Sequence, residues 1–102
     1  MDEQRRVADF VARHGLETPP EYRLLDLTSE VGELAKDAAE STGYGDTPAD
    51  LEISADELGD ALFALLALAD SLEIDASEAL EDALEKYERR LDGADTPGSP
   101  TE

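Results

Sequence analysis

Residues 61–69 read ALFALLALA, and every one of them is apolar. The stretch belongs to a helical segment that opens at Ser54, with Glu57 at the spacing of a capping box. A helix that is apolar on all sides has to be buried on all sides. A single chain of 102 residues has too modest a core to do this alone. The stretch therefore predicts a helical protomer with this helix in the middle of a dimer.

Three further helices are predicted around this one. The first covers about residues 2–14, and the second opens with TPPE at 18–21 as a capping box and ends near 41–43. The last starts at Asp75, with Glu78 closing another capping box, and ends at Gly93. No segment reads as a strand, and the connections are short apart from residues 42–53. We therefore expect an all-α, antiparallel four-helix bundle-like protomer, assembled as a dimer or higher oligomer.

The chain reads as one domain, residues 1–92, followed by a polar tail at 93–102 that is expected to be disordered. Cysteine is absent, which excludes disulfides and thiolate metal sites. The first ten residues lack the apolar run of a secretory signal, and the apolar run at 61–69 is far shorter than the ~20 residues of a membrane span. A cytoplasmic protein is expected.

The charge balance is strongly acidic, with 27 acidic against 8 basic residues and a net charge of −19. Nucleic acids and anionic membranes both require basic surface, so neither is expected as a partner. The acidic residues are spread over every segment. Such a surface repels itself in dilute buffer and is screened in molar salt, where the Debye length is about 3 Å. The composition therefore predicts a halophilic host.

The arrangement acid, apolar, glycine, acid occurs twice, as EVGE at 30–33 and as ELGD at 57–60. Each acidic pair lies three residues apart, on neighbouring turns of a helix. An antiparallel hairpin would bring the two pairs face to face. Four carboxylates that close cannot all stay ionised without cations, and all-oxygen ligands suit Mg²⁺ or Mn²⁺. The pattern predicts a metal site of four residues: Glu30, Glu33, Glu57 and Asp60.

The glycine inside each pair has an expected purpose too. Gly32 and Gly59 lack a Cβ, so helix backbones or a bulky ligand could approach closely beside the metal. Simpler interpretations stay open: Glu57 could be only the far half of a capping box, and Glu30 and Glu33 could be solvated surface. The apolar neighbours of the glycines are expected to anchor the two helices: Val31 and Leu58.

The stretches EVGELAK, DELGDALFALLALADSLEID and EALEDALEKYERR resemble the MazG-like nucleotide pyrophosphohydrolases of the all-alpha NTP pyrophosphatase superfamily. The resemblance covers about Pro20–Arg90, and the family signature E-x-x-E followed by E-x-x-D falls on the four acids named above. It implies a homo-oligomer, a dimer or tetramer. It also implies Mg²⁺-dependent hydrolysis of a nucleoside triphosphate between the α and β phosphorus, giving monophosphate and pyrophosphate, in the removal of unwanted nucleotides.

Relatives use basic residues of the last helix on the phosphates, which implies this role for Lys86 and Arg89. Both would also be favourable at a helix C-terminus for electrostatic reasons alone. Lys36, one turn after Glu33, is an alternative phosphate contact. Many relatives carry an asparagine after the matching lysine, where this chain has Tyr87, so the selection of base and sugar stays open.

Rival interpretations remain. Within the superfamily, phosphoribosyl-ATP pyrophosphatases and dUTPase-type enzymes share the same chemistry. A catalytically silent helical dimer, acting as a regulatory module, would equally explain the apolar run at 61–69. A di-iron bundle is disfavoured because it expects Glu-x-x-His pairs and the chain has one histidine.

Overall fold

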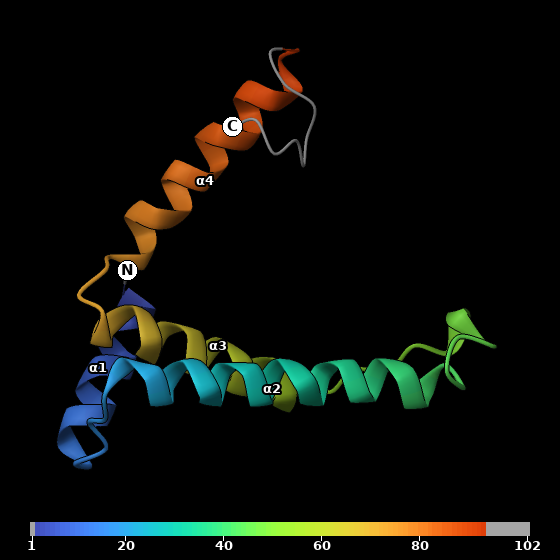
Figure 1. Cartoon of the computed structure of the whole chain (residues 1–102), viewed down its shortest axis with the longest axis horizontal. Coiled ribbons are helices and arrows are strands. Elements are labelled where there is room, and N and C mark those ends of the chain that lie inside the picture. The colour runs from blue at the N-terminus through green and yellow to red at the C-terminus, as the bar shows by residue number, and fades with distance from the viewer. Residues whose placement is uncertain (1, 94–102) are drawn as a thin grey trace.

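The computed structural model describes residues 2–93, which are helical and contain no strand (Figure 1). The predicted all-α class is confirmed, and residues 94–102 of the predicted tail lie outside the described part. Within residues 2–93, no helix combines the length and apolar character that a membrane span requires. The elements are α1 (Asp2–Arg13), α2 (Pro20–Ser41), the short 3-10 turn η1 (Pro48–Asp50), α3 (Ala55–Ser71) and α4 (Ala76–Leu91).

The starts of α3 and α4 follow the predicted caps, whereas the start of α2 does not. Ser54 and Asp75 each accept backbone N–H groups from the first turn of their helices. The capping box predicted at Thr18 is wrong, because Pro19 is the N-cap residue of α2 and no side chain caps this helix. Pro19 precedes another proline, which holds it in the extended conformation seen here, φ −57° and ψ 149°.

The small hydrophobic core is centred on α3, which packs against both α1 and α2. Its buried apolar side chains in the described part of the chain come almost entirely from the predicted apolar run. They are Ala61, Ala64, Leu66 and Ala67 of α3 together with Val11 of α1. Most of these are small, so the packed helices come close together and the core contains little volume.

The last helix, α4, extends away from the other three instead of packing beside them (Figure 1). Of the predicted antiparallel four-helix bundle, the chain shows the α2–α3 pair, on which α1 packs through α3. The Cα radius of gyration is 16.8 Å, against about 13 Å for a compact chain of 100 residues. The physical reason is that the apolar stripe of α4 finds no partner within residues 2–93: Leu80, Leu84 and Tyr87 are all exposed.

The direction of α4 is fixed by a side chain of α1. The Gln4 amide nitrogen donates to the Ile74 carbonyl at 2.8 Å, and the Ala76 backbone N–H donates to Gln4 Oε1, also at 2.8 Å. Ala76 is the first residue of α4, whose N–H has no acceptor within the helix. Gln4 thus spans the α3–α4 connection and completes the cap that Asp75 provides.

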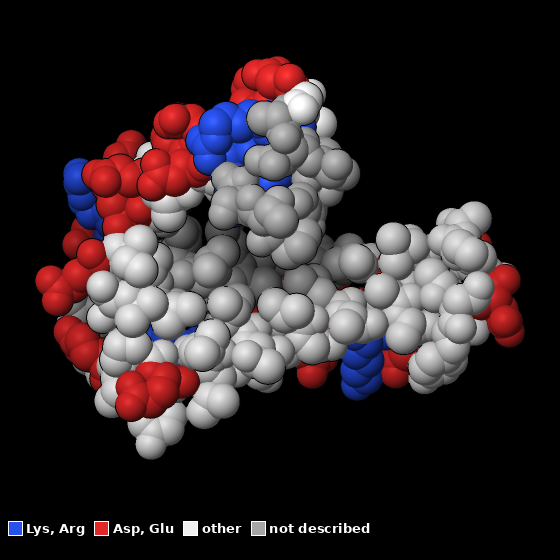
Figure 2. All heavy atoms as spheres, turned by 45° about the horizontal axis from the view of Figure 1, so that its top comes forward, with Lys and Arg blue, Asp and Glu red and all other residues white. Residues whose placement is uncertain are grey.

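A second apolar stripe lies uncovered on α3. Leu58, Leu62 and Leu65, at helical spacing, have exposed fractions of 60%, 52% and 48%. The full burial expected for residues 61–69 is not reached within one chain. The predicted anchoring by Val31 and Leu58 is also wrong for the single chain, because both side chains are exposed. In the view of Figure 2, acidic side chains lie mainly along the edges of the molecule, and many of the described side chains between them are uncharged.

Replacement of Gln4 tests how α4 is held. We expect Gln4→Ala to lower the free energy of unfolding by about 1–2 kcal/mol, because two hydrogen bonds are lost. Gln4→Glu keeps the acceptor for Ala76 and loses only the donor, so it should lie between the parent and Gln4→Ala. Urea denaturation of the three proteins measures this, and equal stabilities would contradict the assigned role.

Candidate functional site

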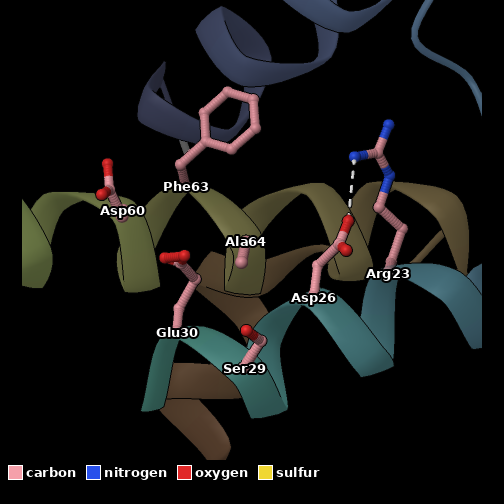
Figure 3. A pocket seen from close by; sticks show the side chains of 7 residues that line it. All are labelled: Arg23, Asp26, Ser29, Glu30, Asp60, Phe63 and Ala64. Atoms are coloured by element: carbon pink, nitrogen blue, oxygen red, sulfur yellow. Dashed lines mark ion pairs between the residues drawn. The ribbon is translucent and has the colours of Figure 1, made fainter. Parts of the chain in front are cut away.

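The facing sides of α2 and α3 carry the two predicted acidic pairs. The Glu30 and Asp60 carboxylates project from α2 and α3 into one cavity (Figure 3). This cavity has a volume of about 270 Å³, and we call it the acid cavity. It is lined by Arg23, Asp26, Ser29, Glu30, Asp60, Phe63 and Ala64.

Glu57 completes the arrangement on the α3 side and has an unusual environment. Burial raises the pKa of the Glu57 carboxyl, and the charges of Asp37, Glu33 and Glu30 on α2 raise this pKa further. A proton on Glu57 could also be shared with the Asp37 carboxylate, which acts in the same direction. Glu57 Oε2 is buried and has no hydrogen-bond partner in the described part of the chain. An acceptor in this state is suited to binding a proton, a water molecule or a cation.

The donor set fits a hard divalent cation, although no cluster is already formed. Within residues 2–93, no three acidic or histidine side chains lie close enough together to hold a metal ion as they stand. The facing carboxylates nonetheless supply only oxygen ligands, and Glu57 Oε2 lacks a partner. These are the ligands that Mg²⁺ and Mn²⁺ prefer. The residues that would hold the ion are the predicted four: Glu30, Glu33, Glu57 and Asp60.

Two residues near the acids lie outside the predicted set of four. Buried Arg23 donates a hydrogen bond to the Leu16 carbonyl, and its guanidinium lies 3.9 Å from the Asp26 carboxylate (Figure 3). Arg23 therefore ties the start of α2 to the loop before it. Asp37 is the main charged neighbour of Glu57. Arg23 and Asp37 lie seven residues before and after Glu30, and this spacing places them on its helix face.

The predicted phosphate contacts are spread over the molecule. Lys36 is exposed on α2. The Lys86 ammonium lies 5.1 Å from the centre of the Tyr87 ring on α4, and Arg89 lines a shallow cavity of α4 among acidic residues. Because α4 extends away from α2 and α3, the structure does not bring Lys86 or Arg89 to the acid cavity of its own chain (Figure 1).

The two motif glycines are not required by helix packing. A Cβ added at Gly32 or Gly59 would meet no atom within 4 Å, apart from the glycine's immediate surroundings on its own helix. The expectation that they let helix backbones approach is therefore wrong for the described chain. The expectation that they leave room for a ligand is compatible with this open space.

Comparisons with known proteins identify the family. The sequence profile of the MazG nucleotide pyrophosphohydrolase domain matches residues 19–93, and the chain belongs to this family. The predicted resemblance is confirmed. The chain is also similar to the uncharacterized protein YpjD of Bacillus subtilis (strain 168), with 38% identity over 68 residues. The match covers 63% of this chain and 60% of that protein's length. No solved structure gives a significant match.

The raised pKa of Glu57 has a consequence for stability without metal. A carboxyl whose pKa is higher in the folded than in the unfolded chain destabilises the fold as it ionises, so stability should fall as the pH rises through the raised value. We expect Glu57→Gln to remove this fall and to raise the Tm of the metal-free protein at neutral pH.

The matched control is Glu52→Gln, which removes the same charge from an exposed loop. Thermal melts between pH 4 and pH 8 in the presence of a chelator compare the three proteins. If Glu57→Gln has the same Tm as the Glu52→Gln control at every pH, the raised pKa assigned to Glu57 is incorrect.

Proposed function

We propose that the chain is a Mg²⁺-dependent nucleoside triphosphate pyrophosphohydrolase that gives a nucleoside monophosphate and pyrophosphate, in the removal of unwanted nucleotides. The observation that carries this proposal is the facing of the family's acidic pairs across α2 and α3, with Glu57 Oε2 buried and unpartnered. Membership of the MazG family supports the reaction class.

Mg²⁺, or Mn²⁺ in its place, would be held by Glu30, Glu33, Glu57 and Asp60. When bound, such an ion neutralises phosphate charge and activates water. Glu57 is our candidate to orient the attacking water and take its proton, because its buried Oε2 has no hydrogen-bond partner among the described residues. The water oxygen forms a bond to the α phosphorus, the bond from this phosphorus to the bridging oxygen breaks, and pyrophosphate leaves.

Phosphate binding in this proposal uses Lys36 of the same chain, one turn after Glu33. Lys86 and Arg89 would reach the phosphates only from a second copy, because α4 extends away from its own acid cavity. Arg23 already interacts with the Leu16 carbonyl and the Asp26 carboxylate, so in this proposal it positions the start of α2 and does not bind phosphate.

A homo-oligomer, a dimer or tetramer, is part of the same proposal. Its support is the two uncovered apolar stripes, on α3 and on α4, together with a radius of gyration too large for a compact chain of this length.

The net charge of −19 supports a salt-adapted protein. We also propose that residues 1–92 form one domain. The location we propose is the cytoplasm, where nucleotide pools would supply the substrate.

Rival functions are separated by substrate. A phosphoribosyl-ATP pyrophosphatase or dUTPase-type enzyme would use the same acids on a narrower substrate. A catalytically silent dimerisation module is favoured by one observation: within residues 2–93, no three carboxylates are already gathered as a metal site.

The activity test measures pyrophosphate release from a panel of nucleoside triphosphates, dUTP and phosphoribosyl-ATP, with Mg²⁺ in high salt. We expect release from at least one of them, and a loss of about 100-fold or more in kcat for Glu57→Gln, because the proton acceptor is removed. Glu52→Gln should behave as the parent does. If no substrate releases pyrophosphate, the proposed enzymatic function is wrong, and the catalytically silent dimerisation module is the remaining interpretation.

The assembly test uses light scattering in low and in multimolar KCl. We expect a dimer or tetramer whose population grows with salt, since screening weakens the repulsion between acidic chains. Leu65→Glu should give monomers, because it places a charge on the α3 stripe at a position outside both cavities of α3. Leu51→Glu, a similarly exposed position in the loop before α3, is the matched control. A monomeric parent at high salt contradicts the assembly.

A further inference from the structure

A second cavity adjoins the acid cavity on the other side of α3. It lies between α1 and α3, has a volume of about 460 Å³ and is here called the α1–α3 cavity. Phe63 lines both cavities, and Gly59 of the α1–α3 cavity directly precedes Asp60 of the acid cavity. A ligand with two parts could therefore extend past Phe63 from one cavity into the other.

The glycine of the second acidic pair opens this cavity. A glycine inside a helix is unfavourable, and no packing contact of the described chain explains it, since a Cβ at Gly59 meets nothing within 4 Å. Gly59 forms part of the cavity wall, so a side chain there would enter the cavity. Unlike Gly32, which lines no described cavity, Gly59 leaves space in a cavity that a bound molecule could fill.

The wall formed by α1 combines aromatic and charged groups. Glu3, Arg6, Phe10 and Arg13 line the cavity at spacings of three and four residues, which places them on one face of α1. The Phe10 ring makes an edge contact with the Phe63 ring at 5.9 Å between centres, and the Arg13 guanidinium lies 5.9 Å from the Phe10 ring centre. Two of the 8 basic residues of a very acidic chain are thus placed beside an aromatic pair.

This combination matches the chemistry of a nucleobase. Bases stack on aromatic rings and guanidinium planes, and arginine donates two hydrogen bonds to the O6 and N7 acceptors of guanine. The Glu3 carboxylate can accept from the N1–H and N2–H donors of the same base. Adenine offers an amino donor where guanine has O6, so it would leave an arginine donor unpaired.

We propose that the α1–α3 cavity receives the base and sugar of the nucleotide, with preference for a guanine-type base, while the phosphates lie at the acid cavity. This assignment rests on the proposed function. Arg6 contacts the base in this arrangement, and Gly59 provides the space that the nucleoside fills.

The test compares kcat/KM for GTP, ATP, CTP and UTP in the parent, Arg6→Gln and Arg5→Gln. Arg5 is the matched control, because it is the neighbouring arginine of α1 and lies outside the cavity. We expect the parent to prefer GTP. Arg6→Gln should lower kcat/KM for GTP by about 5- to 100-fold and change that for ATP much less, as expected for loss of a bidentate contact to a base. Arg5→Gln should keep the parent's ratio of GTP to ATP.

A second variant fills the cavity. Gly59→Leu should melt no lower than the parent, since it replaces a helix glycine where there is open space. It should abolish the competitive inhibition that guanosine, which carries no phosphate, exerts on the parent. Equal kcat/KM for all four bases, or an Arg6→Gln profile identical to that of Arg5→Gln, overturns the assignment while leaving the proposed hydrolase intact.

Failure of the proposed function is recognised separately. If no triphosphate is hydrolysed, calorimetric titration of GMP still decides the assignment of the cavity. Binding to the parent that is lost in Arg6→Gln and kept in Arg5→Gln supports it, and absence of GMP binding to the parent overturns it.

Discussion

The packing of α3 on α2 is the contact on which the candidate site depends. The contact surface of α3 contains the buried alanines Ala61 and Ala64, whose small side chains let the helices come close. Glu57 lies one turn before Ala61, and Asp60 one turn before Ala64. The apolar contact therefore continues directly into acidic residues on the same helix faces, and those residues are brought against α2.

This arrangement brings negatively charged side chains close together, which by itself destabilises the fold. The Glu57 carboxyl is brought near Asp37, Glu33 and Glu30, and its pKa is raised by burial and by these charges. Apolar packing on the adjacent turns offsets the repulsion. A site assembled in this way is poised to bind cations, because a proton or a metal ion relieves the repulsion that the fold imposes.

The sequence predicted what depends on local contacts. Ser54 and Asp75 cap their helices as expected, since a cap involves residues two or three positions apart. The facing of the acidic pairs followed from helix periodicity and a hairpin. The direction of α4 could not be predicted, because it rests on a bond between Gln4 and Ala76, 72 residues apart. Helix periodicity placed Asp37 in the same sector as Glu30 and Glu33, whereas no repeated motif marked Arg23.

The apolar run at 61–69 faces three different environments. One face of α3 packs on α2 through Ala64 beside the acid cavity, and a second faces α1, where Leu66 lines the α1–α3 cavity. The third face, with Leu65, is left exposed. An all-apolar helix is thus not a sign of a large core. Two of its faces shape cavities within the chain, and the third is available to a second copy. Leu62 lies at the boundary, because it is exposed and is also part of the wall of the α1–α3 cavity.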